Sequence, residues 1–169
     1  FGGTSVGDEK CIARVVDILA AHRKSGDELA VVVSAMTGVT DQLIATAQEV
    51  ICSCEYPPIE ALIHALRSRH MKVLETVAPN YREEVGVYID DHLSKLKNIL
   101  TAVHTLRELT PRSKDYIISF GERLSAPIVS AALNQAGITS TVMDGCEAGI
   151  ITNSCHGGAV ALPESYSRI

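Results

Sequence analysis

The sequence predicts an α/β protein: a three-layer α/β/α sandwich around a mostly parallel sheet, incomplete and carrying a helical excursion at residues 57–109. Short β-branched runs alternate with segments of helical periodicity, an order typical of a parallel sheet with helices on both faces. The 169 residues are 46% hydrophobic, which is enough for one compact unit or for a piece of a larger domain.

In the first third of the chain, helix and strand patterns follow one another. Residues 8–24 place apolar side chains at helical spacing, and Ser5 with Asp8 resembles a capping box. Residues 29–33 (LAVVV) are continuously apolar, as in a strand covered on both faces. Thr40 is the expected N-cap of a second helix, whose apolar face ends at Cys54.

The rest of the chain continues with an excursion and two further strands. The prolines at 57–58 precede a long helix, and the proline at 79 separates it from a second, longer one. Residues 110–113 (TPRS) are expected to close the excursion. Residues 115–119 are predicted to form a strand, followed by a helix at 122–135. Gly137 ends that helix, and residues 138–144 return as a strand.

Charge and composition exclude several classes of protein. A net charge of −5 disfavours a broad basic surface, so neither a nucleic acid nor an anionic membrane is an expected partner. The longest apolar runs are far shorter than the roughly 20 residues of a membrane helix, and no export signal opens the chain. Five cysteines without a CxxC pair indicate reduced thiols and a cytoplasmic location.

Three short polar segments each lie between a predicted strand and the next helix. Residues 2–5 follow the presumed end of a first strand, residues 34–40 follow the strand at 29–33, and residues 119–122 follow the apolar run at 116–118. The carboxyl ends of parallel strands share one edge of a sheet, where α/β proteins bind ligands and where helix N-termini attract anions. The sequence therefore predicts a local site for a phosphate or carboxylate, although it contains neither a P-loop nor a GxGxxG motif.

Each of these segments also has a purely structural interpretation. The glycine pair at residues 2–3 is compatible with an ordinary tight turn, and Thr40 with a helix cap alone. Glu122 would be favourable in the first turn of a helix through the helix dipole. A metal or redox site built from Cys146, Cys155 and His156 is a separate alternative, but a structural zinc site needs a fourth ligand and paired spacing.

Four segments resemble sequence blocks of one enzyme family. Residues 1–6 (FGGTSV), 33–41 (VSAMTGVTD) and 119–126 (SFGERLSA) resemble three blocks of aspartate kinase in the family's order. Residues 148–154 (AGIITNS) resemble a fourth. The helical excursion carries no such signature.

The resemblance implies an amino-acid-kinase fold and transfer of the γ-phosphoryl group of MgATP to the β-carboxylate of L-aspartate, at the start of lysine, threonine and methionine synthesis. It implies a phosphate-binding turn at Gly2, Gly3, Thr4 and Ser5. Ser34 and Thr40 would lie at the aspartate site, and Glu122 would accept hydrogen bonds from the substrate ammonium. No metal ligand is assigned.

The resemblance also has limits. The family's lysine before the Phe-Gly-Gly motif would precede Phe1, so no catalytic residue is assigned. The nucleotide-binding half and the regulatory ACT domains would follow Ile169. Residues 1–169 are therefore expected to be the N-terminal, substrate-side part of the kinase domain, inactive alone.

Two alternatives remain open beside the metal or redox site. One is another amino-acid kinase, acting on glutamate, acetylglutamate or a nucleoside monophosphate. The other is a non-catalytic ligand-binding or regulatory module of the same fold. The sequence leaves open whether the protein forms a homo-oligomer, and His156 remains a weak candidate near the predicted site.

Overall fold

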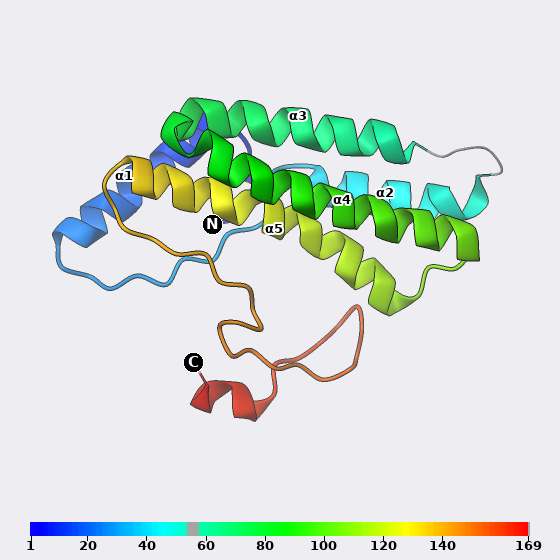
Figure 1. Cartoon of the computed structure of the whole chain (residues 1–169). Helices are drawn as coiled ribbons and strands as arrows, with labels where there is room; N and C mark the ends of the chain where they lie inside the picture. Colours follow the sequence, from blue (N-terminus) through cyan, green and yellow to red (C-terminus); the bar gives the residue numbers. More distant parts are fainter. Residues whose placement is uncertain (54–57, 169) are drawn as a thin grey trace.

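The computed structural model describes residues 1–53 and 58–168, and helices dominate them (Figure 1). The helices are α1 (Glu9–Lys24), α2 (Val39–Cys52), α3 (Ile59–Val77), α4 (Arg82–Leu106) and α5 (Pro111–Gln135). Three short 3-10 turns are η1 (Gly3–Ser5), η2 (Pro79–Tyr81) and η3 (Pro163–Ser167).

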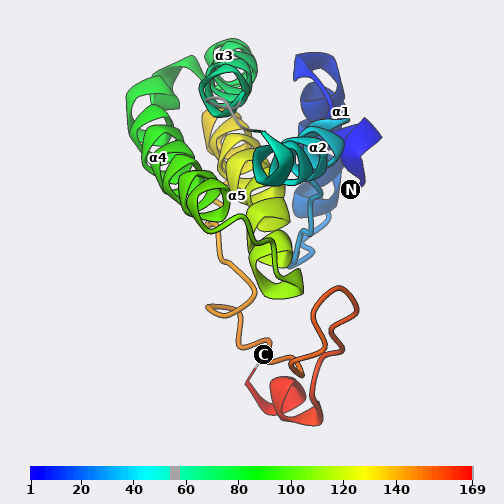
Figure 2. The same cartoon turned by 90° about the vertical axis from the view of Figure 1, so that its right-hand side faces the viewer.

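Helix α5 lies at the centre of the molecule and packs against α1, α2, α3 and α4 (Figure 2). Its buried residues follow helical spacing, for example Ile117, Phe120, Leu124 and Ile128, each fully removed from solvent. Helices α3 and α4 also pack on each other and on α2. The segment predicted as an excursion therefore supplies two of the five long helices and is part of the core.

The predicted α/β/α sandwich is wrong: the described residues contain no strand and no sheet. Residues 115–119, predicted as a strand, lie inside α5. Thr110 and Ser113 form a capping box and Pro111 occupies the first helical turn, so the helix starts before the apolar run. These start signals lie at residues 110–113, the segment expected to close the excursion.

Residues 29–33 and 138–144 were also predicted to be strands, and both are irregular segments without a sheet partner. Val32 is 80% exposed, whereas a central strand would be covered. The Ser140 amide donates to Asn134 Oδ1 at 2.9 Å, so a side chain of α5 takes the place of a neighbouring strand. A β-branched run predicts a strand only where another strand can pair with its backbone.

The first two helices begin close to their predicted positions, but their caps differ from the predicted ones. The helix predicted at residues 8–24 is α1, but its cap is Asp8 alone, which accepts a hydrogen bond from the Cys11 amide at 2.8 Å. Thr40 is not the cap of α2: that position is Gly38, whose φ of 76° is left-handed, and Thr40 lies in the first turn. Cys54 and Pro57, used in the predictions, lie outside the described residues.

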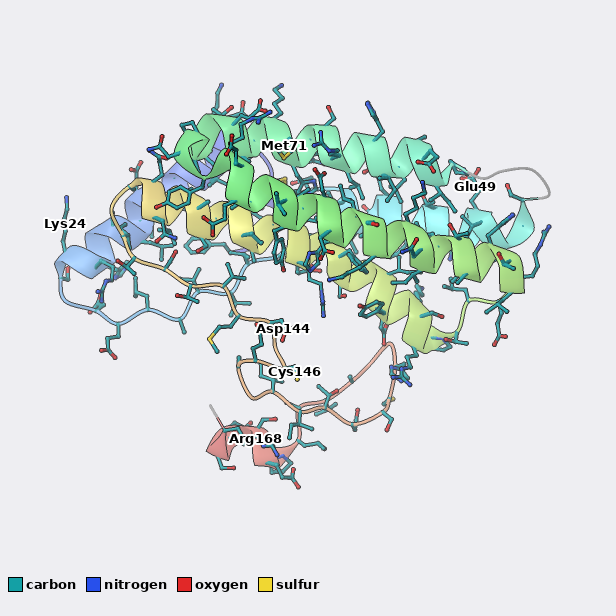
Figure 3. All side chains as sticks on the ribbon, in the orientation of Figure 1. Lys24, Glu49, Met71, Asp144, Cys146 and Arg168 are labelled. Atoms are coloured by element: carbon teal, nitrogen blue, oxygen red, sulfur yellow. The ribbon has the colours of Figure 1, made fainter. Side chains whose placement is uncertain are left out.

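The chain after α5 runs along one side of the helices (Figures 1 and 3). An isolated bridge between Thr152 and Ala161 closes a loop there. This loop returns to α5, where the Gly157 amide donates to Asp115 Oδ2 at 2.8 Å. No helix of the described residues is long and apolar enough to cross a membrane.

His70 on α3 is fully buried in the helical core. Its Nδ1 lies 2.7 Å from the Leu66 carbonyl, while Nε2 has no hydrogen-bond partner within the described part of the chain. Removal from water lowers the pKa of His70 to about 4, although the bond to the Leu66 carbonyl opposes the shift. His70 is therefore neutral in the folded protein at pH 7.

We expect His70 to make stability depend on pH. Between its unfolded pKa of 6.5 and its folded pKa of about 4, the unfolded state binds the extra proton, so stability falls as pH falls. The loss approaches about 3 kcal/mol below the folded pKa, and about 2.5 kcal/mol of it is reached by pH 4.5. Urea unfolding at pH 7 and pH 4.5 measures it.

Two variants separate this effect from general acid unfolding. His70→Leu should lose much of the difference between the two pH values, because no group with a depressed pKa remains at that position. His64→Gln, at an exposed position on the same helix, should retain the wild-type difference. Equal pH dependence in all three proteins would contradict the assignment.

Candidate functional site

The first two predicted site segments lie side by side. The Thr37 hydroxyl donates to the Gly3 carbonyl at 2.9 Å, and the Ser34 amide donates to the Phe1 carbonyl at 3.0 Å. A Cβ added to Gly3 would lie 3.0 Å from the Ala35 carbonyl oxygen. Residues 2–5 and 34–37 therefore form a pair of adjacent loops, in which the backbone at Gly3 lies close to the backbone at Ala35.

One face of α5 supports this pair of loops. Glu122 Oε1 accepts a hydrogen bond from the Ala35 amide at 3.1 Å, and the Ser125 hydroxyl donates to the Ser34 carbonyl at 2.8 Å. Gly121 allows the close approach, since a Cβ there would lie 2.6 Å from the Ala35 Cβ. Ser125 belongs to the block quoted from the sequence, but its polar contact to Ser34 was not predicted.

The third predicted segment is not a turn. Residues 119–122 lie in the middle of α5, far from its first turn at Pro111. The helix-dipole argument for Glu122 is therefore wrong, and two helix N-termini, those of α1 and α2, lie next to the loops instead of three. The predicted convergence nevertheless occurs, because a helix face takes the place of the third turn.

The polar groups of the predicted aspartate site are only partly used by the protein itself. Glu122 is half-buried, and its Oε2 makes no hydrogen bond within the described residues. The side chain of Thr40 does not cap α2. Ser34 is held through its backbone amide and carbonyl. The Oε2 atom of Glu122 and the hydroxyl group of Thr40 are therefore able to bind a small polar ligand.

The glycine turn is open on one side. The Ser5 amide bonds to the Gly2 carbonyl at 2.8 Å. A Cβ added to exposed Gly2 would have no other atom within 4 Å. This leaves room for a group such as a phosphate to approach the backbone.

The structure does not assemble a metal centre from the described residues. They contain no group of three or more His, Cys, Asp or Glu side chains that could hold an ion. Cys146 and Cys155 are free and exposed, and His156 instead faces Asp115, with Nδ1 3.4 Å from Oδ2. Among described residues, then, the metal alternative has no support.

Comparison with known families gives the class of protein. Residues 1–165 match the model of the amino acid kinase family. The chain belongs to this family.

The chain is similar over its whole length to aspartokinases. It is 29% identical to aspartokinase 3, chloroplastic, of Arabidopsis thaliana and 27% identical to an aspartokinase of Mycobacterium tuberculosis. Each alignment covers 100% of this chain, but only 29% and 27% of those relatives. The chain thus spans less than a third of the relatives' length.

Solved structures of Escherichia coli aspartokinase III have a similar fold. The complex with lysine and aspartate (T-state) superposes with a TM-score of 0.79 at 25% identity, covering 98% of this chain and 34% of that one. The complex with aspartate and ADP (R-state) gives a TM-score of 0.82 over the same shares at 24% identity. The second likeness concerns the fold alone.

Gly121→Ala should loosen the contact between α5 and the loops. The added Cβ would meet Ala35 at 2.6 Å, and such overpacking lowers the free energy of unfolding by about 1–3 kcal/mol. The matched control is Gly86→Ala on α4, whose Cβ would meet the flexible end of Met71 at 3.3 Å (Figure 3).

Urea unfolding of the two variants tests this contact. We expect Gly86→Ala to be neutral or stabilising, because alanine favours a helix by up to about 1 kcal/mol over glycine. If both substitutions stabilised the protein equally, Gly121 would not be needed for the close approach.

Proposed function

We propose that this chain carries the aspartate-side loops of an aspartokinase, which transfers the γ-phosphoryl group of ATP to the β-carboxylate of L-aspartate. The observation that carries this proposal is the cluster of Glu122, the loop at 34–40 and the glycine turn at 2–5. The similarity to aspartokinases over the whole chain supports the same activity.

Glu122 is proposed to bind the α-ammonium group of aspartate. Its Oε1 is engaged with the Ala35 amide, which orients the carboxylate. Oε2 would then accept hydrogen bonds from the ammonium group. A half-buried carboxylate makes charge-assisted hydrogen bonds to an ammonium group, which are stronger than neutral ones. One side chain would thus both fix the loop and select an amino acid.

Ser34 and Thr40 are proposed to contact the substrate from the neighbouring loop, with the Thr40 hydroxyl as a hydrogen-bonding group. Gly2, Gly3, Thr4 and Ser5 would bind the transferred phosphate through their backbone and hydroxyl groups. ATP supplies the phosphoryl group when bound. Mg²⁺ is expected to accompany the nucleotide, held mainly by its phosphates.

Phosphoryl transfer depends on positioning and electrostatic stabilisation more than on a protein nucleophile. The role of this loop cluster is therefore to hold the aspartate carboxylate beside the phosphate turn. We further propose that the chain is the N-terminal, substrate-side part of the kinase domain. A cytoplasmic location and a role in lysine and threonine biosynthesis are consistent with its free cysteines and with this reaction.

In the protein expressed from its complete reading frame, Glu122→Gln should weaken the binding of aspartate much more than the binding of ATP. Glutamine keeps an oxygen for the Ala35 amide but removes the charge facing the ammonium, so the aspartate KM should rise by about 10–100-fold. The ATP KM should change little. Steady-state kinetics with each substrate varied in turn measures both.

Glu49→Gln is the matched control, because Glu49 is an exposed residue of α2 (Figure 3). Its kinetic constants should equal those of wild type. A large rise in the ATP KM with unchanged aspartate KM in Glu122→Gln would reject the assignment of Glu122. Absence of aspartate-dependent ATP turnover in the wild type would reject the proposed function.

We expect the 169-residue chain by itself to show no aspartate-dependent ATP turnover. It spans only 27–29% of the aspartokinases named above, and the nucleotide-binding half of the kinase domain is expected outside residues 1–169. A coupled assay for ADP, with aspartate present and absent, measures this directly. Turnover above the aspartate-free background would contradict the expectation.

A further inference from the structure

Arg69 links the helical core to the loop at 34–40 and to Gly7, two residues after the glycine turn at 2–5. It lies on α3, in the part of the sequence that carried no functional signature, and its side chain is half-buried. Nη1 donates to the Thr37 carbonyl at 2.8 Å, and Nη2 donates to the Gly7 carbonyl at 3.1 Å. One guanidinium group thus bonds to two backbone segments 30 residues apart in sequence.

The same two segments are interlocked by a second contact. The Thr37 hydroxyl donates to the Gly3 carbonyl at 2.9 Å. A Cβ added to Gly7 would lie 2.6 Å from that hydroxyl oxygen and 3.1 Å from the Gly3 carbonyl. The absence of a side chain at Gly7 therefore leaves space for the Thr37 hydroxyl. Arg69 binds the backbone carbonyls of the same two residues, Thr37 and Gly7.

The geometry suits arginine in particular. A guanidinium group is planar and presents its N–H donors in a rigid fork, so two acceptors bonded to it are held at a fixed separation. A lysine ammonium is a single point on a flexible stem and does not impose this separation. If Arg69 is removed, the Thr37 and Gly7 carbonyls lose these donors.

We propose that Arg69 is a positioning residue, which fixes the aspartate-binding loop (34–40) relative to the phosphate-binding turn (2–5). This inference rests on the proposed function of these loops. Arg69 touches no substrate in this account. It acts through Thr37 and Gly7, so α3 determines how the two substrates face each other.

The kinetic signature of positioning differs from that of simple stabilisation. When each loop still binds its own substrate but their relative placement is lost, kcat falls while both KM values stay nearly constant. A misplacement of about 1 Å can reduce the rate by about 100-fold. A purely stabilising residue would instead change the folded fraction, and the activity per folded molecule would be unchanged.

Three variants test the proposal in the protein expressed from its complete reading frame. Arg69→Met should lower kcat by about 10–100-fold per folded molecule, with less than about a threefold change in either KM. Arg69→Lys should restore little of the lost kcat, because lysine lacks the rigid fork of N–H donors. Arg67→Met is the control: on the same helix, Arg67 makes an exposed ion pair with Asp90, at 2.7 and 3.0 Å, away from the loops.

Hydrogen–deuterium exchange provides a readout that does not depend on activity. Peptides covering residues 2–8 and 34–40 should exchange faster in Arg69→Met than in Arg67→Met, while peptides from α4 should not differ. Equal loop exchange in the two variants, or equal kcat in both, would overturn the inference. A KM rise that accounts for the whole loss of activity would overturn it as well.

The two proposals fail in different ways. If wild type turns over no ATP in response to aspartate, the proposed function fails, and positioning for that reaction fails with it. The exchange comparison still decides whether Arg69 holds the two loops together. If wild type is active and Arg69→Met matches Arg67→Met, only the inference about Arg69 fails.

Discussion

The contact between α5 and the loop at 34–37 determines the rest of the site. Gly121 brings the helix close to Ala35, and Glu122 and Ser125 then bond to the backbone of that loop. A larger residue at 121 would separate the two by the width of a methyl group, and both hydrogen bonds would lengthen with it. The position of Glu122, and of every group around it, follows from this approach.

The position of α5, and with it the contact to the loop at 34–37, depends on the packing of the other helices. Because the helix packs against α1, α2, α3 and α4, the helical core sets the position of Glu122. The loop at 34–37 is held by Glu122 from α5 and by Arg69 from α3. This otherwise irregular segment is thereby held in one arrangement.

The sequence predicted the helices better than the strands, for a physical reason. In residues 8–24 the helical period continues over several turns, and no other element fits it. The run at 115–119 is too short to distinguish a strand from a buried helix, and the capping signals at Thr110 and Ser113 decide it. Residues 29–33 have strand composition, but sheet formation requires a paired backbone, which local sequence does not report.

The site was predicted in part. The convergence of Gly3, residues 34–40 and Glu122 was expected from a shared sheet edge, and the structure brings them together through a helix face instead. The sequence blocks pointed to these segments independently of the secondary structure around them, and their role in binding remains a proposal. Arg69 could not be found in this way, because a lone arginine on an amphipathic helix is typical of a solvated face, and its acceptors are distant in sequence.

The amide of Ala35 provides the most direct test of this arrangement. Its exchange with solvent, followed by NMR in wild type, Glu122→Gln and Glu122→Ala, reports whether the α5 side chain receives that hydrogen bond. The account predicts a slowly exchanging amide in wild type and in Glu122→Gln, where an acceptor oxygen remains, and fast exchange in Glu122→Ala. Fast exchange in wild type, or the same rate in all three proteins, would contradict it.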